Sequence, residues 1–309
     1  MPAHAGVGAA EWHPAARRSR VADERTYAWL LLPALLTLGV LSLLPILVTV
    51  WLSLTSWNLM VPTSGAFVGL ENYGRMLADR YFGNAVMITL ILILGPVALQ
   101  MLLGLGLALH LHRDLPLLRA SRAVFITPMV IPPVIAGLIW KVLLIPNLGG
   151  VNYFLGLVGV SGPNWLETPI WALIAVGLVA VWEDTPFVML LLLAALESLP
   201  TEPFEAATVD GASAWQRLRY VTIPLIMPAI LVALLFRIIA SLNIFPVIYV
   251  MTKGGPGRST EVLSYYAFTH GFQFLDIGYA SALAMGLFAL IVALSGLFML
   301  LRVRFTGAE

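Results

Sequence analysis

Three ionisable residues interrupt long apolar runs of this sequence. Glu183 and Asp184 lie in the run that starts at Ile170, and Arg237 lies in the run that starts at Pro224. Glu183 and Arg237 each come 13 residues after the start of their run, which predicts mid-membrane depth for both. A charge there costs about 2.5–3.5 kcal/mol on insertion scales, so each should face protein or a water-filled path. We expect a structural ion pair, a polar site on a solute path, or both.

The two carboxylates can hardly meet one arginine, because one helical step turns them about 100° apart. The carboxylate that Arg237 does not neutralise is therefore left for another task. It could accept hydrogen bonds from the hydroxyl groups of a solute while Trp182 or Phe187 offers an apolar ring face. The candidate substrate cavity is formed by Trp182, Glu183, Asp184, Phe187 and Arg237.

Other residues give no support for enzyme chemistry. The absence of cysteine excludes disulfides, thiolate metal sites and thiol catalysis. His110 and His112 are two positions apart and do not face each other on a helix, so we expect no metal pair. The segment 254–260 resembles a phosphate-binding loop but lacks its lysine and follows an apolar run rather than a strand. We expect no catalytic residue, no metal and no cofactor bound by this chain.

The composition indicates a membrane protein. Hydrophobic residues make up 60% of the 309 residues and charged residues only 11%, against about a quarter charged in soluble domains. Six apolar runs predict an all-α integral membrane protein with six transmembrane helices in one domain, 27–302. The runs cover 27–54, 84–111, 123–145, 170–196, 224–251 and 277–301.

Shorter features refine this plan. Three prolines at 128, 132 and 133 predict that the third span is broken or bent beside a pathway. The segments 75–81 and 151–160 are too short to cross and are expected at the membrane interface.

Six spans place both termini on one side. The N-terminal tail 1–26, the loop 110–122, the loop 197–224 and the C-terminal tail 303–309 together with the adjoining Arg302 hold 11 Lys and Arg residues. The loops and span ends on the other side hold 5. The excess of positive charge predicts that both tails and the loop 197–224 are cytoplasmic. The net charge of +1 gives no nucleic-acid signature.

The polar loop 197–224 predicts a helix-turn-helix. Pro203 suits the first turn of a helix, and Glu205 lies where the helix dipole favours an anion. Gly211 has no Cβ and can take the left-handed conformation that ends one helix. A second helix over 215–220 follows it.

This loop resembles the EAA loop of binding-protein-dependent ABC importer permeases. The family pattern is Glu-Ala-Ala, three residues, Gly, nine residues and Ile-x-Leu-Pro. This sequence matches the pattern at the same spacing with Glu205, Ala206, Ala207, Gly211 and Pro224. Val221 replaces the Ile of the pattern, and Ile223 replaces its Leu. The amino-acid sequence from Asp210 to Gln216 is typical of the sugar-importer branch, similar to the maltose and glycerol-phosphate type permeases.

The resemblance implies the ABC type I importer permease fold in a multi-pass protein of a prokaryotic cell membrane. It implies an ATPase-coupling loop made by Glu205, Ala206, Ala207, Asp210, Gly211 and Pro224. The implied partners are a second homologous permease subunit, a dimer of ATPase subunits that use ATP and Mg, an external solute-binding protein and the lipid bilayer. The chain would then form half of the pathway for a sugar or sugar-like solute and would not be an enzyme.

Two alternatives stay open. The acidic pair could serve a proton relay in a proton-coupled secondary transporter, although this leaves the helix-turn-helix loop without a task. The chain could also be an ABC importer permease for a non-sugar solute such as glycerol phosphate.

Overall fold

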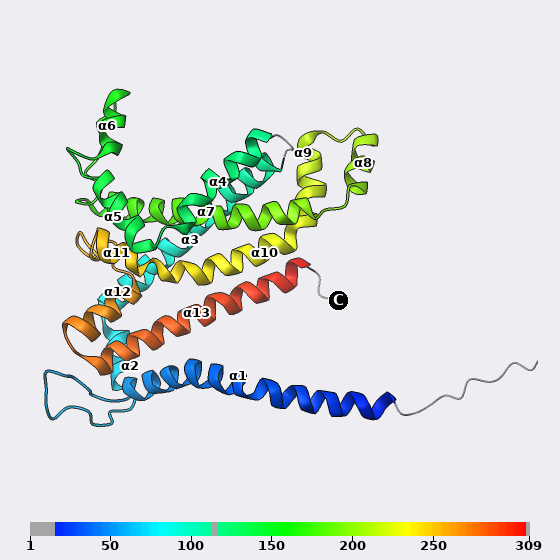
Figure 1. Cartoon of the computed structure of the whole chain (residues 1–309). Helices are drawn as coiled ribbons and strands as arrows, with labels where there is room; N and C mark the ends of the chain where they lie inside the picture. The colour runs from blue at the N-terminus through cyan, green and yellow to red at the C-terminus, as the bar shows by residue number, and fades with distance from the viewer. Residues whose placement is uncertain (1–15, 113–115, 307–309) are drawn as a thin grey trace, which may run out of the picture. The chain divides into compact units, whose positions relative to one another are not determined.

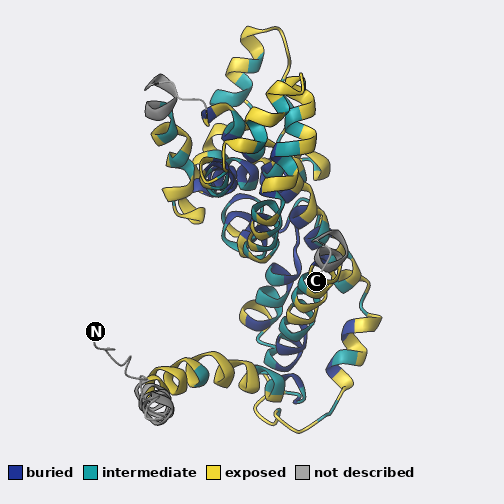
Figure 2. Ribbon diagram, turned by 90° about the vertical axis from the view of Figure 1, so that its right-hand side faces the viewer, coloured by how far each residue is buried: buried dark blue, intermediate teal, exposed yellow. Residues whose placement is uncertain are grey.

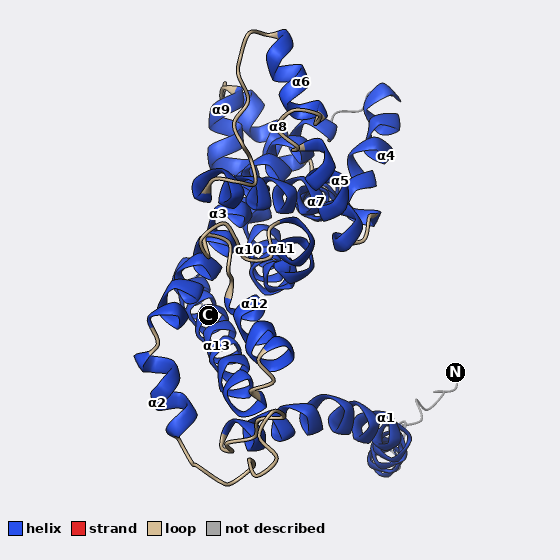
Figure 3. Ribbon diagram, turned by 90° about the vertical axis from the view of Figure 1, so that its left-hand side faces the viewer, coloured by secondary structure: helices blue, strands red, loops and turns tan. Residues whose placement is uncertain are grey.

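The computed structural model describes residues 16–112 and 116–306 and divides the chain into two compact units, Met1–Trp51 and Leu52–Glu309. All regular elements among these residues are helices, coloured blue in Figure 3. Two isolated β-bridges, Thr55 with Phe67 and Asn58 with Asp276, join loop segments. The predicted all-α class is confirmed.

The first unit consists of helix α1 (Ala16–Ser53) as far as Trp51. The helix begins within the segment expected as an N-terminal tail, 1–26, of which residues 1–15 lie outside the described part. Every leucine from Leu31 to Leu47 is exposed. So much exposed apolar surface requires a non-aqueous neighbour, either lipid or another membrane subunit.

Helices α3 (Arg80–Leu111) and α7 (Pro169–Glu197) form the centre of the second unit. They run parallel, since a Cβ added to Gly177 would meet Pro96 while one added to Gly104 would lie 2.6 Å from Cγ1 of Val188. The absence of a side chain at Gly104 thus allows the two helices to pack closely. Figure 2 shows buried residues concentrated where helices of this unit face one another.

The third predicted span is broken, as expected from its prolines. Helix α4 (Pro116–Val130) and helix α5 (Pro133–Leu143) meet at an angle of 102°. Pro132 between them has extended backbone angles of φ −59° and ψ 139°. Backbone groups freed by such a break need protein or a cavity to satisfy them.

The fifth predicted span is also interrupted, which the continuous run 224–251 did not suggest. Helix α10 (Ile223–Ala240) passes into a 3-10 turn, η2 (Ser241–Ile244), and then into helix α11 (Phe245–Met251). Asn243 in η2 has the non-helical angles φ −80° and ψ 18°. Pro246 explains the break, because proline has no N–H to donate to the carbonyl four residues earlier and its ring clashes with that carbonyl.

Helix α13 (Ile277–Thr306) supplies the sixth span and continues into the predicted tail 303–309, of which 307–309 lie outside the described residues. Within the described ranges, five helices are long and apolar enough to cross a membrane, or six with the bent α4–α5 pair (Figure 1). The predicted number of spans is therefore reached.

Short helices occupy the connections between spans. Helix α2 (Glu71–Ala78) overlaps the predicted interfacial segment 75–81, and α6 (Gly150–Leu157) overlaps 151–160. Helix α12 (Leu263–Phe268) continues into the π-helix η3 (Thr269–Gln273).

Candidate functional site

Arg237 of α10 joins three helices inside the second unit. Its Nη2 lies 2.5 Å from Oδ2 of Asp184 on α7, and its Nε donates to Oε1 of Gln100 on α3 at 2.9 Å. Gln100 in turn donates from Nε2 to the carbonyl of Ala180 at 2.9 Å. Arg237 is only 4% exposed. The guanidinium is thus neutralised and hydrogen-bonded within the protein, and Asp184 rather than Glu183 is its partner.

Gln100 was missed by reasoning from the sequence. It is fully buried in α3 and holds both the arginine and a carbonyl of α7. An amide in an otherwise apolar span was the available signal, because a polar group in a membrane helix must find a partner.

A cavity of about 400 Å³ lies beside this network. It is bounded by the α4–α5 break, through Met129, Ile131 and Pro133, and by the α10–α11 break, through residues 240–244 except Leu242. Irregular backbone is tolerated at membrane depth where it is buried or lines a cavity. The other lining residues are Leu92, Pro96, Ala180, Glu183, Asp184, Phe187, Phe236, Arg237 and Val247.

Glu183 borders this cavity without a hydrogen bond or ion pair to any described residue. The residue is 8% exposed and belongs to the lining. Phe187 lines the same space, and its ring meets that of Phe236 edge-on with centroids 6.2 Å apart. The cavity therefore presents an uncommitted carboxylate next to aromatic surface.

Trp182 lies elsewhere. Its ring packs edge-on against Trp140 of α5 at a centroid distance of 5.6 Å, within the apolar cluster around α5, α7 and α11. It is not among the cavity lining. Of the five residues proposed for the cavity from sequence, four come together and Trp182 packs against a neighbouring helix.

The loop between α7 and α10 forms a helix-turn-helix. Helix α8 (Glu202–Val209) ends where Gly211 takes φ +73°. The N–H of Gly211 donates to the carbonyl of Thr208 at 3.1 Å, and the N–H of Ala212 donates to that of Ala207 at 2.9 Å. These two bonds form a Schellman motif, which requires a left-handed residue at the glycine position.

The second helix of the loop has its own start signal. Ser213 caps α9 (Ala214–Arg217) in a reciprocal capping box with Gln216. The chain then passes through the π-helix η1 (Leu218–Thr222) into α10. Nη1 of Arg217 donates to the hydroxyl of Thr208 at 3.1 Å and ties the two arms of the turn together.

The loop presents an exposed mixed surface. Glu205, Ala206, Asp210, Gly211 and Pro224 are exposed and Ala207 is partly buried. Three large side chains are more than two-thirds exposed: Val209 at 88%, Trp215 at 69% and Tyr220 at 71%. Exposed apolar and aromatic side chains rimmed by polar ones are typical of a protein interaction site.

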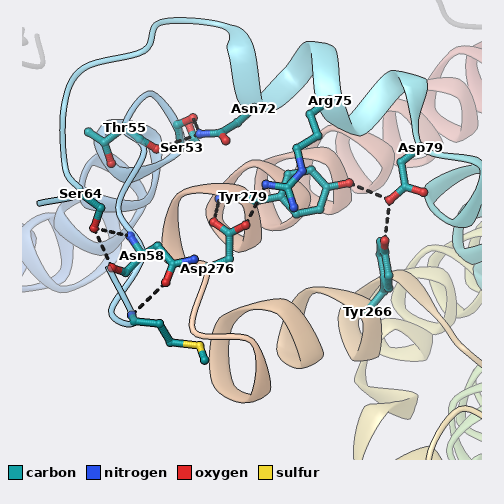
Figure 4. Close-up of polar contacts among 11 residues, drawn as sticks. Ser53, Thr55, Asn58, Ser64, Asn72, Arg75, Asp79, Tyr266, Asp276 and Tyr279 are labelled. Carbon is teal, nitrogen blue, oxygen red and sulfur yellow. Dashed lines mark hydrogen bonds and ion pairs between the residues drawn. The ribbon is translucent and has the colours of Figure 1, made fainter. Parts of the chain in front are cut away.

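A second polar cluster lies at the N-terminal end of α3, around Asp79 (Figure 4). Asp79 caps α3 by accepting from the N–H of Tyr81, and it accepts from the hydroxyls of Tyr266 at 2.5 Å and Tyr279 at 2.9 Å. Burial alone would raise the pKa of Asp79, but these hydrogen bonds outweigh it and lower the pKa below its usual value. Burial together with Asp79 raises the pKa of Tyr266 to about 12, so this phenol stays a donor.

The same cluster joins α2 to α13. Arg75 forms an ion pair with Asp276 at 2.8 Å, and its guanidinium carbon lies 4.0 Å from the centre of the Tyr279 ring. His270 of η3 stands edge-on to the rings of Tyr266 and Tyr279. Burial, reinforced by the positive charge of Arg75, lowers the pKa of His270 from its usual 6.5, although Asp276 and Asp79 oppose the shift. The cluster therefore favours a neutral imidazole.

Metal ligation has no support in the described ranges, where no group of three or more His, Cys, Asp or Glu side chains is placed to hold an ion. The fold and the two sites define a class: a membrane transport subunit with a largely apolar cavity that carries three ionisable side chains, and with an exposed helical loop.

Comparison with known proteins gives the family. Residues 100–305 match the binding-protein-dependent transport system inner membrane component, and the chain belongs to this family. It is 38% identical to the trehalose/maltose transport system permease protein of Thermococcus litoralis over 85% of this chain and 89% of that protein. It is 37% identical to the sulfoquinovosyl glycerol transport system permease protein of Agrobacterium fabrum, over 87% and 88% of the two chains.

Solved structures show the same fold. A bacterial ABC transporter involved in the import of the acidic polysaccharide alginate contains a chain that matches with a TM-score of 0.77 at 22% identity. The match covers 93% of this chain and 99% of that chain. The predicted type of permease fold is confirmed.

Family membership settles the class of transporter. The protein is a multi-pass inner membrane permease subunit of an ABC importer and is not itself an ATPase. This finding decides against the proton-coupled secondary transporter.

We predict that Arg237→Met lowers the amount of correctly assembled transporter in the membrane. The change leaves Asp184 and the fully buried Gln100 without their donor. Breaking a fully buried pair costs about 3–5 kcal/mol, and the 33% exposure of the Asp184 side chain reduces the cost below that range. The double variant Arg237→Met/Asp184→Asn should recover most of the loss. The measurement is size-exclusion chromatography of the fluorescently tagged complex.

Glu197→Gln is the matched control, because it removes a carboxylate from the half-exposed pair with Arg122. Surface pairs contribute about 0–1 kcal/mol, so assembly should stay normal. Normal assembly of Arg237→Met would show that the buried pair does not hold the helices together.

We predict that the stability of the assembled transporter falls as the pH drops below 6.5, and that His270→Phe reduces this fall. The pKa of His270 is lower in the folded protein than in the unfolded chain. Between these two pKa values the imidazole of the unfolded chain binds a proton, while that of the folded protein stays neutral. Stability is therefore full above the unfolded pKa and declines toward the folded pKa. Thermal unfolding midpoints on either side of pH 6.5 measure the effect, and an identical pH dependence in both proteins would contradict it.

Proposed function

We propose that this chain is one half of the translocation pathway of an ATP-driven importer for a sugar or sugar-like solute. The observation that carries the proposal is the connection between cavity and loop. Asp184 lies on α7, which leads into the helix-turn-helix, and Arg237 lies on α10, which leaves it. A force on the loop would therefore reach the two helices that hold the cavity.

The solute class is supported by the relatives and by the cavity. The similar proteins are named for trehalose/maltose and for sulfoquinovosyl glycerol. A carboxylate that can accept hydroxyl groups, next to the rings of Phe187 and Phe236, suits a polyhydroxylated solute with apolar faces.

The proposal includes four kinds of partner. An ATPase dimer that uses ATP and Mg would dock on the loop through Glu205, Ala206, Ala207, Asp210, Gly211 and the exposed aromatic residues. The positive charges of the tails and loops support a cytoplasmic position for this loop and both termini. A second homologous permease subunit and lipid would cover exposed apolar faces such as that of α1.

An external binding protein would deliver the solute. Support comes from a second similar structure, a bacterial alginate ABC transporter in complex with an alginate pentasaccharide-bound periplasmic protein. Closure of the ATPases on ATP would move the loops and shift the cavity between inward-open and outward-open states, as a rigid-body switch between two packed arrangements.

We predict that Gly211→Val abolishes coupling while the subunit still inserts and folds. Space is not the obstacle, since an added Cβ would meet nothing within 4 Å, but the residue is held at φ +73°. A left-handed residue costs about 1–2 kcal/mol, and a β-branched one is a genuine outlier there. Sugar uptake and substrate-stimulated ATP hydrolysis by the reconstituted complex with its binding protein are the measurements.

Gly211→Asn is the matched control, because asparagine tolerates this conformation and should retain most coupling. Wild-type uptake should require ATP and the binding protein and should persist when the proton gradient is collapsed. Uptake by this chain alone, driven by a pH gradient, would overturn the proposed function. Full coupling in Gly211→Val would overturn the role of the loop.

A further inference from the structure

We propose that the cavity selects neutral sugars and rejects anionic solutes, with Glu183 as the residue that determines this selection. The inference rests on the proposed function and names the substrate class of the same site. The inference follows from the charges in the cavity: Asp184 and Arg237 form an ion pair, whereas Glu183 has no ion-pair partner among the described residues.

The cavity has no uncommitted cation among its described lining residues. Its ionisable lining residues are Glu183, Asp184 and Arg237. The Arg237 side chain is 5% exposed, with Nη2 on Asp184 and Nε on Gln100. An anionic group of a solute would have to compete with Asp184 for the charge of this guanidinium. Displacing Asp184 would leave a second carboxylate unpaired at membrane depth, which is costly.

Glu183 makes the same space unfavourable for an anion in a second way. Its carboxylate accepts no hydrogen bond from a described residue and forms no ion pair with a described base. With Glu183 ionised the three groups carry a net charge of −1, and with Glu183 protonated the net charge is zero. In neither state is there a positive charge free of a carboxylate partner that could replace the hydration shell of a phosphate, sulfonate or carboxylate.

A neutral sugar meets complementary groups in the same place. Glu183 can accept two neighbouring hydroxyls, and the exposed amide of Asn243 in η2 can donate and accept. The edge-on rings of Phe187 and Phe236 supply apolar surface for a sugar face. The volume of about 400 Å³ lies within the range of small-molecule sites, about 300–1,000 Å³. The arrangement disfavours glycerol phosphate, the non-sugar alternative considered from the sequence.

The test measures equilibrium binding to the purified assembled transporter without nucleotide and without binding protein, so that the selectivity of the external protein does not enter. The probes are matched neutral and anionic pairs: glucose and glucuronate, trehalose and trehalose 6-phosphate, glycerol and glycerol 3-phosphate. The proteins are wild type, Glu183→Gln and Glu167→Gln. Glu167 is an exposed carboxylate in the connection before α7 and outside the cavity lining, so its variant removes the same charge elsewhere.

Wild type and Glu167→Gln should bind at least one neutral sugar and should bind its anionic partner more weakly. Glu183→Gln should reduce the ratio of the affinities for the neutral and the anionic member of a pair by about tenfold or more. The reason is that it removes a unit charge a few ångströms from the solute and leaves the Asp184–Arg237 pair intact. If wild type binds the anionic member of a pair as tightly as the neutral member, the charge selection is overturned while the proposed function stands. An unchanged preference in Glu183→Gln would overturn the role of Glu183. Failure of every neutral sugar to bind wild type would overturn both this inference and the proposed solute class.

Discussion

The buried guanidinium of Arg237 is the constraint on which the second unit depends. A charge at this depth is tolerated only if its neighbours neutralise it and satisfy its N–H groups. Asp184 supplies the opposite charge and Gln100 supplies an acceptor, and these three side chains come from α10, α7 and α3. The network therefore fixes how the three helices meet, more specifically than apolar packing between membrane helices would.

The helix breaks and the network serve the same site. The α4–α5 bend and the turn η2 both border the cavity, and α10 carries Arg237 one turn before η2 begins. The hydroxyl of Ser241 donates to the carbonyl of Arg237 at 2.6 Å and satisfies backbone at the start of the break. Because α7 and α10 also flank the helix-turn-helix, the proposed displacement of that loop would be transmitted to residues that line the cavity.

Much of this architecture could be predicted from local signals. The apolar runs predicted the spans, three prolines predicted the α4–α5 break, and Gly211 predicted the turn between α8 and α9. The break in α10 was overlooked although Pro246 signals it. Which carboxylate pairs with Arg237, the part played by Gln100 and the packing of Trp182 on Trp140 depend on how helices rotate against one another. Composition and spacing along one chain do not determine that rotation.

The central claim is that the solute binds beside Glu183, between the two helix breaks, while Arg237 stays committed to Asp184. The most direct measurement is a cryo-electron microscopy structure of the assembled transporter in a lipid nanodisc with a transported sugar bound. The account predicts sugar density in this cavity with a hydroxyl within about 2.5–3.0 Å of the Glu183 carboxylate and the Asp184–Arg237 pair intact. A sugar bound elsewhere along the pathway, or in direct contact with an Arg237 released from Asp184, would contradict it.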